Sequence, residues 1–89
     1  MERSTMVGLS PQATIIRQKD KLGVFCSDRT IWSRDGLQAV LLLAIDQGAK
    51  SVGEQKTLLM HTPDGPAREE DAALIFAEFV LTFEDALKN

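Results

Sequence analysis

Cys26, His61 and Asp64 are the residues of this sequence that could act together as a nucleophile, a base and an orienting carboxylate. Such a set works only if the strand predicted around Cys26 lies beside the apolar run that ends near His61. Activated thiolates favour helix N-termini or electropositive pockets, whereas Cys26 falls inside a predicted strand. We interpret Cys26 as a buried structural cysteine and His61 as a surface or capping side chain. The same residues make a still weaker metal site. The sequence therefore predicts no catalytic residue, no metal and no cofactor.

The segment Gly48-Ala49-Lys50-Ser51 is similar to the end of a phosphate-binding loop. The full motif has a glycine directly before the lysine, follows a strand and opens a helix. Here Ala49 precedes the lysine, the segment follows a predicted helix, and no helix is predicted after it, so we reject the motif. The acids at 69–71 resemble a carboxylate cluster, but their position in the first turn of a predicted helix explains them through the helix dipole.

Basic and aromatic side chains are interleaved along residues 13–34. The bases are Arg17, Lys19, Lys21, Arg29 and Arg34, with Phe25 and Trp32 among them. Aromatic rings beside bases on a sheet can stack on nucleobases and contact phosphates. Against this, three aspartates lie in or next to the same stretch and neither common RNA-binding sheet motif is present. Binding of nucleic acid through a hairpin at 13–34 is therefore the alternative function.

Residues 1–12 are predicted to form a flexible N-terminal arm, because Pro11 near its end restricts the backbone of Ser10 before it. The predicted strands and helices follow from residue 13 on. Residues 13–18 and 24–32 are rich in β-branched side chains, and a charged stretch ending in Gly23 joins them. This pattern predicts a β-hairpin with a longer turn or a bulge. Asp35-Gly36 could form a second hairpin turn, but strong helix formers follow it.

Residues 37–47 are predicted to form a helix, with Ser33 as a good N-cap and Gly48 just past its end. This helix is apolar almost all round, which indicates burial on more than one side. Residues 48–56 are interpreted as a loop. Residues 57–62 are interpreted as a third strand, although a turn of helix also fits.

Residues 63–66, Pro-Asp-Gly-Pro, are a turn that ends one element and precedes a helix over 67–88. The predicted fold is therefore α+β. It has a small antiparallel sheet, made of the hairpin and a third strand, packed with two helices in the order β-β-α-β-α. Residues 13–89 form one domain.

The predicted 67–88 helix has one broad apolar face, and Leu74 and Leu81 lie away from that face beside a polar stripe. A helix packed on one sheet needs only one apolar face, so the second line of leucines indicates a contact with another chain. We expect an oligomer or partner interface at Leu74, Leu81, Phe76 and Phe83. The simplest partner is a second copy of the chain, as a homodimer.

Composition sets outer limits on the function. The chain has 89 residues, 44% of them apolar, with one cysteine and a net charge of −3. Residues 1–35 carry a net charge of +2 and residues 36–89 carry −5. The longest apolar run is 39–45, too short to span a bilayer, and no signal-peptide core is present. We expect a cytoplasmic, non-enzymatic protein with a regulatory role, which acts by binding an unidentified protein partner.

Overall fold

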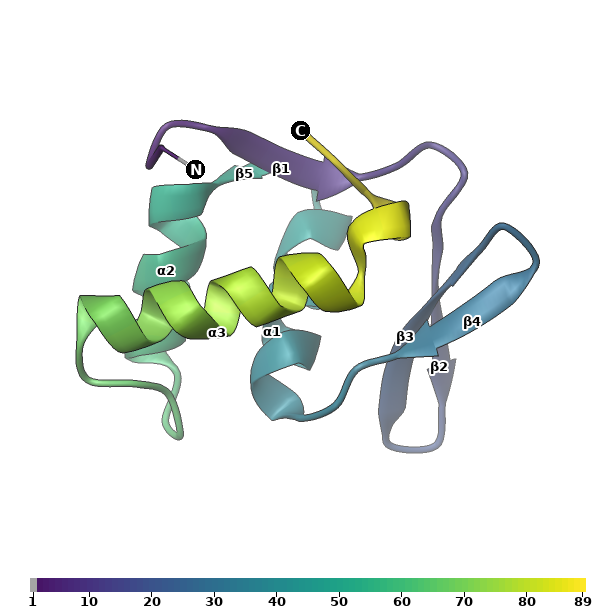
Figure 1. Ribbon diagram of the computed structural model, residues 1–89. Coiled ribbons are helices and arrows are strands. Elements are labelled where there is room, and N and C mark those ends of the chain that lie inside the picture. The colour runs from purple at the N-terminus through teal and green to yellow at the C-terminus, as the bar shows by residue number, and fades with distance from the viewer. Residues whose placement is uncertain (1) are drawn as a thin grey trace.

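The computed structural model describes residues 2–89, and within them the chain is α+β, as the sequence predicts (Figure 1). Three helices and two three-stranded antiparallel sheets account for most of these residues. The strands are β1 (Met6–Leu9), β2 (Thr14–Gln18), β3 (Lys21–Cys26), β4 (Arg29–Trp32), β5 (Lys50–Ser51) and β6 (Leu87–Lys88). The helices are α1 (Gly36–Asp46), α2 (Val52–His61) and α3 (Glu69–Thr82), with a 3-10 turn, η1, at Glu84–Ala86.

The predicted hairpin is a three-stranded meander, β2-β3-β4, because the single strand expected over 24–32 is divided in two. Ser27 and Asp28 have φ values of 53° and 63° and form a two-residue turn in which Cys26 faces Arg29. Two successive positive φ angles suit the right-handed twist of the flanking strands. The inner face of β3 contributes Leu22, Val24 and Cys26 to the core.

The prediction of a flexible arm over 1–12 is wrong for residues 6–9, which form β1 at the centre of the second sheet. Its first residue, Met1, lies outside the described residues. Val7 is fully buried and pairs with Lys50, while Leu9 pairs with Leu87. Both partner strands are only two residues long and come from distant parts of the chain. The strand therefore depends on tertiary contacts that its own short sequence does not reveal.

The helix predicted over 37–47 is confirmed as α1. Its N-cap is Asp35 rather than Ser33: the Asp35 carboxylate accepts a hydrogen bond from the Gln38 N–H at 2.9 Å. Gly48 follows the C-terminus with φ of 134°, a conformation that only glycine adopts without strain. Gln38 is itself buried, and its side-chain amide donates to the Thr82 hydroxyl of α3 at 3.2 Å.

The third strand predicted at 57–62 is wrong, and the alternative of a helical turn is right, because α2 continues to His61. The loop predicted at 48–56 is wrong from Val52 on, where α2 begins. The helix begins with a capping box. The Ser51 hydroxyl accepts from the Glu54 N–H at 3.0 Å, and the Glu54 carboxylate accepts from the Ser51 N–H at 3.2 Å. Val52, Gln55 and Leu59 are buried along one side at helical spacing. The sequence Ser-x-x-Glu was the available signal for this start.

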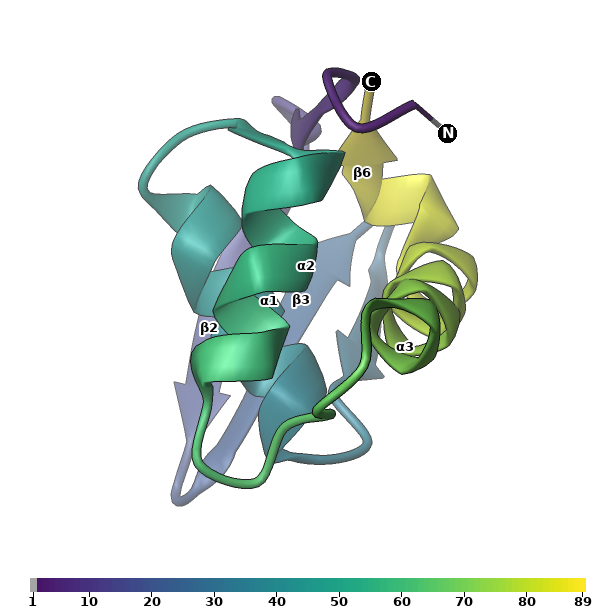
Figure 2. The ribbon, with the colours of Figure 1, turned by 90° about the vertical axis from the view of Figure 1, so that its left-hand side faces the viewer.

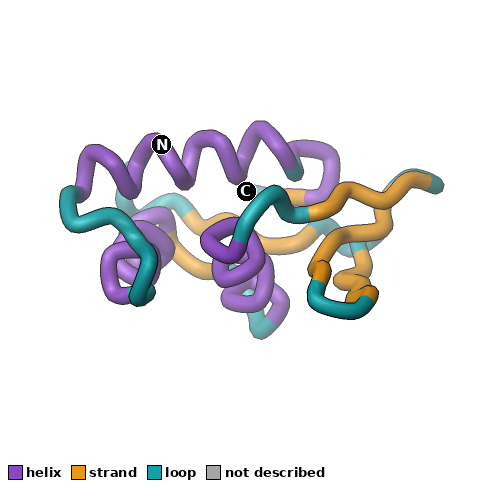
Figure 3. The backbone as a smooth tube through the Cα atoms, turned by 90° about the horizontal axis from the view of Figure 1, so that it is seen from below, coloured by secondary structure: helices purple, strands orange, loops and turns teal. Residues whose placement is uncertain are grey.

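The helix predicted over 67–88 is confirmed only in part, since α3 ends at Thr82. Phe83 leaves the helical conformation, and the chain then makes η1 and pairs with β1 as β6. The helix lies across α1 and α2 and packs on both (Figures 1 and 2). Figure 3 shows α3 as an outer layer whose side away from α1 and α2 is covered by no other element of the described chain.

Candidate functional site

Cys26, His61 and Asp64 do not come together. Cys26 is buried, and its thiol donates to the Asp85 carbonyl oxygen at 3.5 Å. His61 is exposed near the C-terminus of α2, with Nδ1 2.8 Å from the Thr57 carbonyl oxygen. The loop with Asp64 follows α2, which lies at the opposite end of the molecule from β3 (Figure 1). These side chains therefore form no nucleophile–base pair.

Residues 2–89 contain neither a metal-ligand cluster nor a helix that could span a membrane. No cluster of three or more His, Cys, Asp or Glu side chains in this part of the chain could hold a metal ion. None of its helices is both long and apolar enough to cross a membrane.

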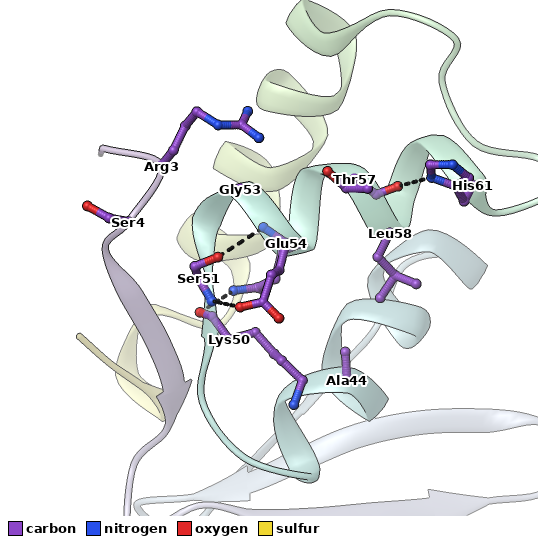
Figure 4. A pocket seen from close by; sticks show the side chains of 11 residues that line it. Arg3, Ser4, Ala44, Lys50, Ser51, Gly53, Glu54, Thr57, Leu58 and His61 are labelled. Carbon is purple, nitrogen blue, oxygen red and sulfur yellow. Dashed lines mark hydrogen bonds between the residues drawn. The ribbon is translucent and has the colours of Figure 1, made fainter.

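A pocket with a volume of about 790 Å³ lies between the N-terminal segment and α2 (Figure 4). Arg3, Lys50 and His61 lie on separate sides of it and do not converge on a common point. The Arg3 guanidinium forms an ion pair with Glu69 of α3. No single position in the pocket would therefore let one bound anion contact Arg3, Lys50 and His61 together.

The N-terminus of α2, at the edge of this pocket, has its amide donors already occupied. The Val52 and Gly53 N–H groups donate to the carbonyl oxygens of Thr5 and Arg3 at 2.9 Å, and the Glu54 N–H donates to Ser51. A helix does begin after Gly48-Ala49-Lys50-Ser51, contrary to the sequence prediction. The first-turn amides that would face a phosphate are nevertheless already bonded within residues 2–89.

The capping box of α2 makes the stability of the fold depend on pH through Glu54. Hydrogen bonds from the Ser51 backbone N–H and from the Ser51 side chain lower the pKa of Glu54 below its ordinary value. Because the pKa is lower in the folded state, the carboxylate stabilises the fold above the ordinary glutamate pKa. That contribution is lost as the pH falls through the lowered value.

Replacing Ser51 with alanine is expected to lower the free energy of unfolding at neutral pH by about 1 kcal/mol, because the N-cap acceptor is removed. Urea titrations of wild type and variant at pH 7 and at about pH 3 would measure this. We expect the two proteins to differ less at the acid pH, because the Glu54 carboxylate loses its charge as the pH falls through its lowered pKa. Ser4→Ala, at an exposed serine, is the control. If Ser51→Ala lowered the free energy of unfolding equally at both pH values, the Ser51–Glu54 capping box would not be the source of the pH dependence.

The bases and aromatic residues predicted to form a nucleic-acid surface are divided between two faces of the meander. Phe25 and Trp32 lie on the outer face, and Lys21 places its ammonium 5.9 Å from the centroid of the Trp32 ring. Arg17 and Arg29 stand opposite Leu22 and Cys26, on the other face.

Two bases of the predicted set lie outside the strands. Lys19 lies in the β2–β3 turn, and Arg34 follows β4. Strand alternation thus separates the aromatic rings from both strand arginines, which weakens the nucleic-acid interpretation.

The outer surface of α3 carries the strongest apolar exposure in the described chain. Leu74 is 67% exposed and Leu81 is 69% exposed, whereas Phe76 and Phe83 are buried in the core at 5% and 0%. The two leucines are thus available to a partner, whereas the two phenylalanines of the predicted interface belong to the core and offer no surface. The interface itself stays a prediction. We define the α3 face as the exposed side chains of Glu70, Leu74, Ala77, Glu78 and Leu81.

The α3 face continues into an apolar groove between α2 and α3 with a volume of about 410 Å³. Ala77 and Leu81 belong to both, so the groove and the face form one surface. The groove's only ionisable side chain is Lys56, whose ammonium lies 3.4 Å from the Glu69 carboxylate. The groove is lined by Val52, Lys56, Ala73, Phe76, Ala77, Val80 and Leu81.

No significant match to this chain is found among protein families, curated proteins or solved structures. Neither a family motif nor a known structure therefore supplies site residues. The functional argument depends on the surface itself, in which two neighbouring leucines of one helix stand out.

Acidic side chains surround this surface. Glu70, Asp71 and Glu78 are exposed on α3, and Glu84 and Asp85 follow its end. Residues 69–82 contain no lysine or arginine. Arg68 pairs with Glu70, while no ion pair involves Asp71 or Glu78 within residues 2–89. The apolar stripe thus lies in a negative field, which favours cations in whatever binds there.

Proposed function

We propose that this chain is a small non-enzymatic protein-binding domain that acts by presenting the α3 face to another macromolecule. The observation that carries the proposal is the pair Leu74 and Leu81, about two-thirds exposed on a helix whose other face is already packed. Burying a leucine side chain contributes about 1.5–3 kcal/mol relative to leaving it in water. A partner covering both leucines would therefore gain much of its affinity from this stripe.

The spacing of the stripe supports a helix–helix contact. Leu74, Ala77 and Leu81 are separated by three and four residues, which is the spacing of a coiled-coil seam. The small side chain of Ala77 leaves room between the leucines for a partner side chain. A second copy of the chain, giving the homodimer expected from the sequence, is one partner that could supply such a helix.

Replacing both Leu74 and Leu81 with serine is expected to abolish binding at this face while leaving the domain folded, since exposed positions change stability little. The measurement is photo-cross-linking in cells, with a photoreactive amino acid placed at Ala77 and, as the control site, at the exposed Asp46 of α1. We expect a discrete cross-linked product from position 77 that disappears in the double-serine variant.

Three results would count against the proposal. They are equal products from positions 77 and 46, a product from 77 that persists in the double-serine variant, or no product from 77. Circular dichroism of each purified variant would establish that it is folded. The mass of the product distinguishes a second copy from a different protein.

A further inference from the structure

We infer that the occupant of the α3 face is a basic amphipathic helical segment of another protein, with lysine or arginine on both sides of an apolar stripe. This inference rests on the proposed function and identifies the partner by its chemistry. The juxtaposition that carries it is the exposed Leu74–Leu81 stripe, the apolar groove beside it, and the exposed acids Asp71 and Glu78 that no ion pair neutralises within residues 2–89.

Charge decides between this occupant and a second copy. A parallel pair packed through the α3 face would bring Glu70, Asp71 and Glu78 of one copy against the same acids of the other. An antiparallel pair would instead bring Glu70 and Asp71 of one copy toward Asp85 and Glu84 of the other. Like charges facing each other across a helix pair oppose association, whereas opposite charges select the partner and its orientation. Glu84 and Asp85 extend the same negative field past the end of the helix.

The size of the surface fits one helix of moderate length. The 14 residues of α3 span about 21 Å at a rise of about 1.5 Å per residue. A partner helix of about four turns would cover the leucines and place basic residues near Glu70 at one end and Asp85 at the other. The groove beside Ala77 would take a large apolar side chain of that partner.

The one base close to the groove does not change this charge argument. The Lys56 ammonium lies 3.4 Å from the Glu69 carboxylate, which also pairs with Arg3, and the Lys56 side chain is only 14% exposed. Lys56 and Arg3 share the single Glu69 carboxylate, so one positive charge remains at this edge of the groove. It is outweighed on the α3 side by Asp71 and Glu78, which no ion pair neutralises within residues 2–89, and by the exposed Glu84 and Asp85. The field that a partner meets on the α3 face is therefore set by the acids on α3 itself.

The experiment uses two synthetic peptides with the same leucine pattern, one carrying lysines and the other glutamates at the flanking positions. Fluorescence anisotropy measures their affinity for the full chain. We expect the lysine peptide to bind, and its affinity to fall about tenfold or more in Leu74→Ser/Leu81→Ser and in Glu70→Lys/Glu78→Lys. The second variant should in turn bind the glutamate peptide.

Matched controls separate a specific site from a general attraction of a basic peptide to an acidic protein. Asp20→Lys/Asp64→Lys makes the same change in net charge at exposed sites outside α3. Leu43→Ser/Leu58→Ser removes two exposed leucines from other helices. Both controls should bind the lysine peptide within about twofold of wild type.

Several results would overturn the inference. Equal affinity for the two peptides, equal loss in the Asp20/Asp64 variant, or no binding of the lysine peptide would each do so. A cross-linked dimer from position 77 would do so as well, because it assigns the face to a second copy. In these cases a leucine-dependent product at position 77 still supports the proposed function, whereas absence of that product contradicts the proposed function itself.

Discussion

Replacing Phe79 with alanine is expected to lower the free energy of unfolding by about 3–5 kcal/mol, the usual loss for a buried phenylalanine. Phe79 is fully buried on α3, with ring centroids 6.2 Å from Phe76 and 5.3 Å from Phe83. The cavity would remove the centre of this aromatic row. A domain of this size has about 5–15 kcal/mol of stability in all, so the melting temperature should fall by tens of degrees.

Thermal and urea unfolding followed by circular dichroism would measure this loss. Phe25→Ala is the matched control, because it removes the same side chain from a site on the meander that is 44% exposed. We expect the control to lose less than about 1 kcal/mol. If the two variants were equally stable, the core would not depend on α3 as the structure indicates.

Local sequence signals predicted the elements that depend on local interactions. The pairing of β2 with β3 follows from two β-branched runs joined by a short loop, which predicted a hairpin, and α1 follows from a run of helix formers ending at Gly48. The division at Ser27-Asp28 was missed because neither residue is glycine, although aspartate adopts positive φ more readily than most side chains do. Such a turn has a weaker signature than Asn-Gly.

The elements that sequence reasoning missed depend on contacts between distant segments. β1 is four residues long, and its partners lie more than forty residues away in β5 and about eighty away in β6. Residues 57–62 resemble a strand because they are short and apolar. Residues 57–61 are helical because the Ser51–Glu54 capping box starts α2 before them and Leu59 packs into the core.

The candidate surface was predictable in part, and for a definite reason. Helical periodicity separates Leu74 and Leu81 from the packed face of α3, and the structure exposes both. Periodicity does not reveal that Phe83 ends the helix and lies in the core. Nor does it reveal the groove beside Ala77, because that groove depends on where α2 lies, and α2 was not predicted.

The opposite faces of α3 therefore have different physical roles. The inner face carries the aromatic row that holds the helix on α1 and α2. The outer face carries leucines whose exposure contributes nothing to folding of the described chain. Burial of apolar surface is the main source of folding stability, and the core of this domain is formed without Leu74 and Leu81. Two leucines exposed on one helix face therefore support the proposal that this surface binds a partner.

Replacing Gly65 with alanine is expected to lower the free energy of unfolding by about 3 kcal/mol, at the upper end of the range for overpacking. A Cβ atom at this position would lie 1.8 Å from the Leu59 carbonyl oxygen and 3.0 Å from that of Thr62. Both are backbone atoms, so no side chain can move aside. The loop from α2 to α3, which also holds the Gly65 N–H 2.8 Å from the Thr62 carbonyl oxygen, would have to shift.

Gly36→Ala is the matched control for this loop substitution. A Cβ at Gly36 meets nothing within 4 Å, and Gly36 is the first residue of α1. There alanine should leave stability unchanged or raise it by up to about 1 kcal/mol, because glycine loses more backbone freedom on folding. Urea unfolding of both variants would test the pair. Similar stabilities would mean that the α2–α3 loop tolerates a side chain at Gly65. The packing of α3 against α2, which forms the groove, would then not depend on the close approach of Gly65 to the end of α2.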